Sequence, residues 1–182
     1  LARFDREGTL RWAQLFGTTE DDFATSLAIG DDRLFVGGRW RQVGRFSPSD
    51  PARQNQPFVA AFDTEGSRHW LGLLPGGTGD PRHGTVLDDI ESFATTDVTV
   101  DGGTVWTTGI LAPQRSGHGR NAFLAAWKSG GGQQELREFG TAGLDLPRGV
   151  AVDAEGRVFV VGATEAESDG EADPEERRRS LF

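Results

Sequence analysis

An acidic segment near the end of the sequence carries the residue types of a calcium-binding loop. Four acids fall on loop positions 1, 3, 5 and 12, with a glycine at position 6: Glu165, Glu167, Asp169 and Glu176. Carboxylate oxygens and a sharply turning glycine are what such a loop needs. Glutamate fits the first two positions poorly, and Pro174 interrupts the segment. We therefore expect no cofactor. Calcium at these acids is the alternative to a solvated loop with few apolar residues.

The three histidines are the other candidates for chemistry. His69, His83 and His118 are not at metal-ligand spacing, and no G-x-S-x-G sequence offers a serine nucleophile to pair with one. His69 falls in an expected strand, where we expect it to be packed. A hydrolase or lyase would have to bring His83 and His118 together with Asp88 and Asp89 on one face. We expect no catalytic residues, and such an enzyme is the alternative.

The segment 39–56 interleaves arginine with aromatic residues, the types that dominate binding hot spots. The candidate ligand-binding residues are Arg39, Trp40, Arg41, Arg45 and Phe46, together with His118 from a later loop. An acidic partner or a glycan would suit these side chains. In the alternative interpretation, the arginine stems cover apolar sheet edges while their charged ends stay in water.

Two kinds of expected β-hairpin alternate along the chain and would position these residues. The first kind begins at Leu1, Phe58 and Phe123, and the second kind begins at Ala24, Ala94 and Arg148. Apolar and polar residues alternate with the period of two that strands require, and Val, Thr, Phe and Trp favour a pleated surface. Turns such as Asp101-Gly102-Gly103 supply the glycine that a tight hairpin needs.

The two hairpins together make a four-stranded unit that repeats about every sixty residues, a period typical of β-propeller blades. A solenoid is the structural alternative. We expect an all-β fold of four-stranded antiparallel sheets forming about three blades of a partial propeller. Residues 1–182 would be one segment of three repeats in a circularly shifted frame: about 1–57 with 166–182, 58–122 and 123–165.

The two ends of the chain are expected to hold complementary parts of one blade. Leu1 to Phe16 would supply its third and fourth strands, and Arg148 to Glu165 its first and second strands. Three blades close poorly into a ring, so we expect either an open arc with bare ends or two chains that complete a six-bladed ring. Exposed strand edges and apolar faces would drive such self-association.

The pattern FDxEGxxxW, followed by FGT and later by VxVDxxGxVFVVG, resembles the bacterial SBBP-type repeat of seven-bladed β-propellers. The match is clear in two hairpins of the first kind, at Asp5, Gly8 and Trp12 and at Asp63, Gly66 and Trp70, and in the last hairpin at Val150 to Gly162. The third hairpin of the first kind departs from it, with Lys128 in place of the aspartate and no tryptophan after the turn. The resemblance implies an exported module of the cell surface, the periplasm or the extracellular space. It implies no reaction.

The long connections between hairpins fall at one end of the expected blades, where binding residues are concentrated. Just before the first strand of each blade an acid recurs: Asp22, Glu91 and Asp145. We expect these carboxylates to accept backbone N–H bonds in the loops and to hold adjacent blades. A metal-binding ring of acids is the alternative.

Composition limits the classes of partner. The formal net charge of −9 argues against a nucleic-acid surface, which needs clustered Lys and Arg. The absence of cysteine excludes disulfides and thiol chemistry. The sequence has no run of about 18 apolar residues, the length that would predict a membrane-spanning helix, so we expect no membrane insertion. A chain that opens at Leu1 without a leader is expected to be an internal segment. The expected function is a non-enzymatic module or scaffold that binds protein or glycan, and a repeat without a ligand is a further alternative.

Overall fold

The computed structural model describes residues 1–43, 53–74, 77–78, 94–111, 121–141, 143–165 and 179–181. Its regular structure in these ranges is entirely β, which confirms the expected all-β class. Across the same ranges, no helix is present that would be long and apolar enough to span a bilayer.

The described strands pair into antiparallel sheets in chain order. The β1–β2 hairpin consists of β1 (Ala2–Phe4) and β2 (Leu10–Ala13). The β3–β6 sheet consists of β3 (Phe23–Gly30), β4 (Arg33–Val43), β5 (Arg53–Phe62) and β6 (Arg68–Leu73), with β7 (Gly77–Thr78) on β5. The β8–β11 sheet consists of β8 (Thr95–Asp101), β9 (Thr104–Leu111), β10 (Asn121–Lys128) and β11 (Gln133–Phe139). The β12–β14 sheet consists of β12 (Asp145–Val152), β13 (Val158–Glu165) and β14 (Arg179–Leu181).

All six expected hairpins form, and the repeat extends to their irregularities. In the first kind, the register shifts at the same aromatic position each time: Phe4, Phe62 and Trp127. In the second kind, the first strand bulges between Ala24 and Ser26, between Thr95 and Asp97, and between Pro147 and Gly149. The third hairpin of the first kind keeps the shared bulge although its turn sequence differs. Equivalent positions in different sheets can therefore be compared directly.

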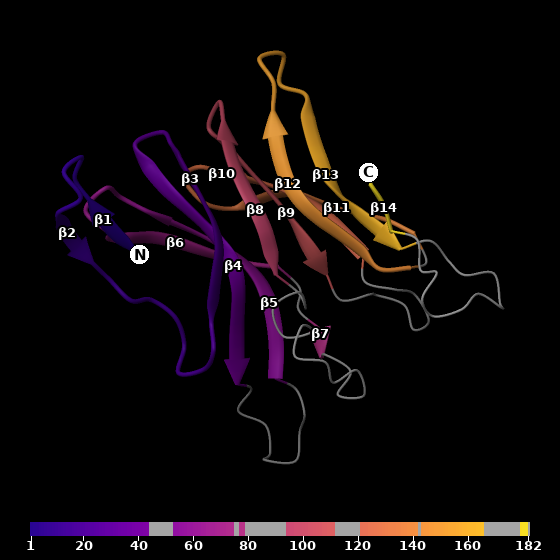
Figure 1. The fold of residues 1–182 in the computed structure, drawn as a ribbon, viewed down its shortest axis with the longest axis horizontal. Coiled ribbons are helices and arrows are strands. Elements are labelled where there is room, and N and C mark those ends of the chain that lie inside the picture. The colour runs from indigo at the N-terminus through magenta and orange to yellow at the C-terminus, as the bar shows by residue number, and fades with distance from the viewer. Residues whose placement is uncertain are drawn as a thin grey trace.

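The sheets stand side by side in an open fan, with the β1–β2 hairpin at one end and the β12–β14 sheet at the other (Figure 1). The first strands are neighbours, because β8 packs against β3 on one side and against β12 on the other. Short turns meet at a common end: Ser129 N donates to Gly103 O at 2.9 Å, and Arg33 donates to Ser129 O at 2.6 Å. The strand ends that lead into the longer connections lie at the opposite end.

The central strands β4 and β5 of the β3–β6 sheet are buried on both faces. One face packs against the β8–β11 sheet in a core that contains Phe35, Phe123 and Trp127. The other face carries Phe58 and Phe62, which pack with Val36, Leu1 and Phe16. This two-sided burial explains why the segment 58–62 is an unbroken apolar run instead of an alternating one.

Three turns of the pattern Asp-x-Glu-Gly share one geometry. In each, an aspartate oxygen accepts the backbone N–H two residues later at 3.0–3.1 Å and the N–H four residues later at 2.8 Å: Asp5, Asp63 and Asp153. The glycine three residues after the aspartate has φ of +80°, +89° or +78° in these turns. A left-handed residue is needed there, and glycine adopts that conformation without strain.

Two of these turn aspartates have lowered pKa values, from which we expect the fold to lose stability in acid. The Ser67 N–H, with Glu65 N–H, holds the pKa of Asp63 below its ordinary value of 3.8 although burial raises it. Burial also raises the pKa of Asp153, but bonds from Arg157 and Glu155 outweigh it and lower the pKa. A lowered folded pKa stabilises the fold fully above the unfolded value, and this stabilisation is lost as pH falls through the folded value.

We therefore expect the urea midpoint to fall with pH below the unfolded aspartate value. The double variant Asp63→Asn with Asp153→Asn should show a shallower fall, because an amide does not titrate. Asp101→Asn, at an exposed strand end, serves as the control and should keep the original slope. Identical slopes in the double variant and the unmodified chain would contradict the assignment.

Candidate functional site

The first strands of three sheets are joined by side-chain hydrogen bonds that centre on Asp97. The Ser26 hydroxyl donates to Asp97 Oδ1 at 2.6 Å and accepts Val98 N–H at 3.2 Å. Asp97 Oδ2 accepts the Val150 N–H at 2.9 Å. Ser26 and Asp97 occupy the same bulge position in β3 and β8, so the same kind of bond recurs from sheet to sheet. Thr25 adds a bond from its hydroxyl to the Thr95 carbonyl.

A cavity of about 260 Å³ lies where these strands begin. Its walls come from the starts of β3, β8 and β12 and from the end of β9: Thr25, Ala94, Thr96, Ile110, Leu146, Pro147 and Arg148. The volume is close to the lower limit for ligand pockets, which is about 300 Å³. The cavity is therefore large enough for at most one side chain or one sugar ring.

The cavity combines hydrogen-bond acceptors, a cation and an apolar wall. The Thr25 hydroxyl donates to backbone carbonyls, and the Thr96 hydroxyl donates to Thr108 O at 3.3 Å. A hydroxyl whose proton is committed in this way keeps lone pairs that accept from a ligand. Arg148 adds N–H donors, and Leu146 and Pro147 are among the apolar residues of the wall. This combination fits a hydroxylated ring or a small polar side chain.

The loop acids hold the connections that lead into the first strands. Asp22 accepts the Thr18 N–H and hydroxyl, and its other oxygen accepts Arg41 N–H at 2.7 Å. Asp145, which is 1% exposed, accepts Thr141 N–H at 2.7 Å. The expected backbone bonds are thus confirmed at both acids, and the Arg41 bond ties the loop to β4 of the following sheet. Glu91 lies outside the described residues.

The same acids explain the recurrent FGT sequence. A Cβ at Gly17 would lie 2.5 Å from Asp22 Oδ2, and a Cβ at Gly140 would overlap Asp145 Oδ2. Thr18 and Thr141 then supply the N–H and hydroxyl groups that the carboxylates accept. The constant spacing from the glycine to the acid is the sequence signal that could have identified this loop.

The structure gives the predicted arginine and aromatic residues different roles. Arg39 is 3% exposed, and its guanidinium carbon lies 4.3 Å from the centre of the Phe23 ring. The Trp40 ring packs edge-on against the Phe58 ring, with the ring centroids 5.9 Å apart. Both residues therefore pack the fold. Arg41 is more accessible, and its guanidinium lies 3.5 Å from Asp21. Arg41 thus remains a candidate for ligand contact, at the same end of β4 as the longer connections.

Several other candidates lie outside the described residues. They are Arg45 and Phe46, the catalytic alternatives His83, His118, Asp88 and Asp89, and the acids Glu167, Asp169 and Glu176. Of the calcium candidates, Glu165 ends β13, where it pairs with Arg179. The described ranges contain no group of three or more His, Cys, Asp or Glu residues that could hold a metal ion.

The expectation that His69 is packed was wrong. His69 is exposed, and its Nε2 lies 3.8 Å from Asp63 Oδ2. β6 is the outermost strand of its sheet, so its side chains are covered less than those of β5. The neighbouring Trp70 is the packed residue, and its ring stacks on Trp127 with the ring centroids 6.2 Å apart.

Two tryptophans link successive sheets, a role that sequence reasoning missed. Trp12 Nε1 donates to Thr64 O at 3.1 Å, and Trp70 Nε1 donates to Ser129 O at 2.9 Å. Each indole reaches the equivalent turn residue of the next sheet. The equal spacing from the turn glycine to the tryptophan in the two hairpins is the sequence feature that could have indicated this role. Glu135 occupies the equivalent position on β11.

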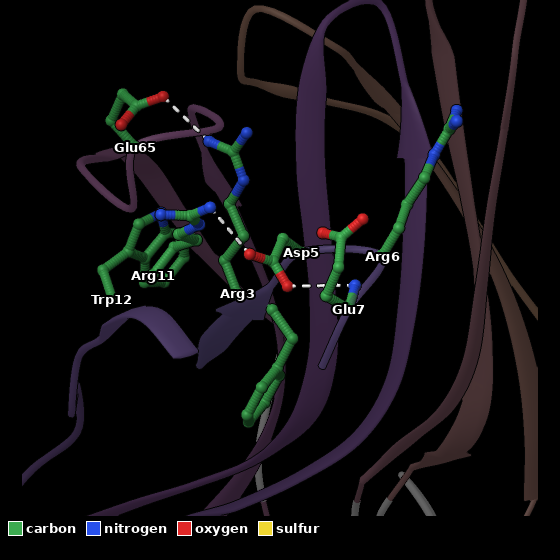
Figure 2. Close-up of a pocket in the computed structure, with 8 residues that line it drawn as sticks. Arg3, Asp5, Arg6, Glu7, Arg11, Trp12 and Glu65 are labelled. Atoms are coloured by element: carbon green, nitrogen blue, oxygen red, sulfur yellow. Dashed lines mark hydrogen bonds and ion pairs between the residues drawn. The ribbon is translucent and has the colours of Figure 1, made fainter. Parts of the chain in front are cut away.

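A second cavity, of about 610 Å³, lies beside the β1–β2 hairpin (Figure 2). It is lined by Arg3, Phe4, Asp5, Arg6, Glu7, Arg11, Trp12 and Glu65. Charges on its wall pair with one another, because Arg3 lies 3.0 Å from Glu65 and Arg11 lies 2.7 Å from Asp5. Phe4 is 59% exposed there. The combination of paired charges and an open aromatic ring indicates an incomplete packing surface.

No protein-family model matches this chain, and no curated protein matches it at a significant level.

Proposed function

We propose that this chain is a non-enzymatic β-propeller segment of three repeats that binds a glycan or a protein at the end where its first strands begin. The proposal extends the resemblance to SBBP-type repeats, and with it we propose an exported bacterial protein as the setting. Sheets that follow one another in a fan, with neighbouring first strands and recurring sheet-to-sheet bonds, support a propeller arrangement.

The cavity at the first strands carries the functional part of the proposal. It is formed by residues from three sheets, so it exists only when the repeats are assembled. It lies at the strand ends that lead into the longer connections, where binding residues of repeat folds gather. Its paired hydroxyl acceptors and its arginine supply directional contacts, while the apolar wall covers the face of a ring or a side chain.

Replacing Arg148 tests this site. Arg148 is exposed at the cavity and also has an interaction within the chain, so the urea midpoint of Arg148→Ala is measured beside its binding, to separate loss of the donors from a change in the fold. A hydrogen bond to a charged group contributes about 1.5–3 kcal/mol, so affinity for the bound ligand should fall roughly tenfold to hundredfold. Arrays of immobilised glycans and of peptides identify the ligand, and titration of the best ligand measures the loss.

Arg137→Ala is the matched control, because Arg137 is an exposed arginine of β11 that pairs with Glu135. It should bind like the unmodified chain. Arg41→Ala should give a smaller loss if the ligand extends over β4. Trp40→Ala is unsuitable as a binding variant, because Trp40 packs on Phe58. Unchanged affinity in Arg148→Ala would remove the cavity from consideration as the binding site.

A further inference from the structure

The three polar residues of the 260 Å³ cavity occupy the same position in neighbouring strands. Near the starts of β3, β8 and β12 the register skips one residue, and the skipped residues are Thr25, Thr96 and Arg148. A β-bulge of this kind takes the extra residue out of the strand ladder and re-aims its side chain. All three extra residues line the cavity, and their strands stand in a row in the fan (Figure 1). One repeated backbone irregularity therefore supplies every polar side chain that the structure describes in the cavity wall.

The two threonines present the same chemical group to the cavity. The Thr25 hydroxyl donates to Gly37 O at 3.2 Å, and the Thr96 hydroxyl donates to Thr108 O at 3.3 Å. Gly37 and Thr108 are equivalent, because each lies opposite the residue that follows the bulge. A hydroxyl has a single proton, so both hydroxyls offer a ligand only their lone pairs. The ligand groups that contact them must be O–H or N–H donors.

The third repeat has an arginine where the other two have a threonine. Arg148 is exposed, and it also interacts within the chain. Its guanidinium carries five N–H donors, enough for that interaction and for a bidentate ligand. Asp97 directs its oxygens to Ser26 and Val150, and none of the lining residues that the structure describes is acidic. The group that meets Arg148 must accept hydrogen bonds, and a carboxylate forms bonds about twice as strong as a neutral acceptor does.

The remaining wall of the cavity is apolar and firmly packed. Ala94, Ile110 and Leu146 are 1%, 1% and 2% exposed, and the Ile110 N–H donates to Ala94 O at 2.9 Å. Such a wall covers the C–H face of a sugar ring, and a volume of about 260 Å³ admits at most one ring. A uronate ring brings a carboxylate for Arg148, hydroxyl donors for the threonines and a C–H face for the wall. An acidic peptide side chain brings the carboxylate but no donor of its own.

We infer that the cavity binds one uronate ring of a glycan, with its carboxylate on Arg148 and its ring hydroxyls on Thr25 and Thr96. This inference rests on the function proposed above and names its ligand class. The formal net charge of −9 repels a polyanion at long range. The ligand is therefore a glycan with an isolated uronate among neutral sugars, held by the local charge of Arg148.

Pairs of matched probes test the ligand class. Each pair is an oligosaccharide that ends in glucuronate, galacturonate or mannuronate, together with its methyl ester, which keeps the ring and removes the charge. In titration calorimetry, at least one acid should bind the unmodified chain about tenfold or more tightly than its ester, as expected for a hydrogen bond to a charged group. Arg148→Gln, which keeps an amide donor, should remove this preference. Arg137→Gln, at an exposed arginine of β11, is the control and should retain it.

The double variant Thr25→Val with Thr96→Val tests the hydroxyl contacts, since valine keeps the branched shape without the lone pairs. Acid and ester should weaken alike, by roughly twofold to tenfold for each neutral hydrogen bond, and the preference for the acid should remain. Urea midpoints close to that of the unmodified chain show that these losses concern binding.

The outcomes separate the ligand class from the site itself. Equal affinity for acids and esters, a preference that survives Arg148→Gln, unchanged affinity in the threonine double variant, or a tetraglutamate peptide that binds more tightly than every acid probe would overturn the uronate assignment. The proposed site would still stand if another ligand's affinity depends on Arg148. Absence of any glycan or peptide whose affinity depends on Arg148 would overturn both.

Discussion

The Gly109→Ala variant is expected to lose about 3 kcal/mol of unfolding free energy, the upper part of the range for overpacked sites. A Cβ at Gly109 would overlap the Ala94 carbonyl oxygen and would lie 2.7 Å from both Thr95 Cα and the Phe123 ring. These neighbours are backbone atoms and a fully buried ring, so displacing them costs free energy. Because domains are stable by only about 5–15 kcal/mol, the loss should be plain in urea unfolding followed by tryptophan fluorescence.

Gly130→Ala is the matched control for this steric effect. Gly130 lies in the β10–β11 turn, and a Cβ there would have no atom within 4 Å. The unfolding free energy of Gly130→Ala should stay within about 0.5 kcal/mol of that of the unmodified chain, as for most exposed positions. Gly38→Ala should repeat the Gly109 result, because its Cβ would overlap the Phe23 carbonyl. Equal midpoints for the Gly109 and Gly130 variants would contradict the close approach at the bulge.

The Asp97→Ala variant is expected to lose about 3 kcal/mol, since a hydrogen bond to a charged group contributes about 1.5–3 kcal/mol and two are removed. Asp97 accepts the Ser26 hydroxyl at 2.6 Å and the Val150 N–H at 2.9 Å. The loss should also separate the β12–β14 sheet from β8. Urea unfolding measures the first effect, and limited proteolysis of the β12–β13 hairpin measures the second.

Two variants separate this role from a general effect of charge. Asp97→Asn keeps an acceptor oxygen of the same shape and should lose about half as much as Asp97→Ala. Asp101→Ala removes an exposed carboxylate from the end of the same strand and should change stability by less than about 0.5 kcal/mol. Similar losses in Asp97→Ala and Asp101→Ala would show that Asp97 does not join the sheets.

The hairpins could be predicted from sequence because their information is local. Asp63 and Gly66 form a turn through bonds among five consecutive residues, so their spacing alone identifies it. The strands alternate with period two wherever one face is covered more than the other. The apolar run 58–62 does not alternate, since its residues are covered on both faces, by the β8–β11 sheet on one face and by Leu1 and Phe16 on the other.

The candidate site could not be predicted, because its residues carry no local signal. Thr25, Thr96 and Arg148 come from three sheets, and only the packing of first strands brings them together. Arg39 shows the reverse problem. Its arginine and aromatic neighbours indicated a binding surface, but β4 turns the Arg39 side chain onto Phe23, where it is covered. The burial of an arginine depends on which sheet lies beside it, and that information is not local.

Amide hydrogen exchange at Val98 and Val150 tests most directly that neighbouring first strands are joined through side chains. The Val98 N–H is bonded to Ser26, and the Val150 N–H is bonded to Asp97. Both amides should be protected in the unmodified chain. In Asp97→Ala, protection at Val150 should fall roughly tenfold or more, as expected from losing a charged acceptor, while Val98 should be affected less. An unprotected Val150 in the unmodified chain, or unchanged protection in Asp97→Ala, would contradict the assembly described above.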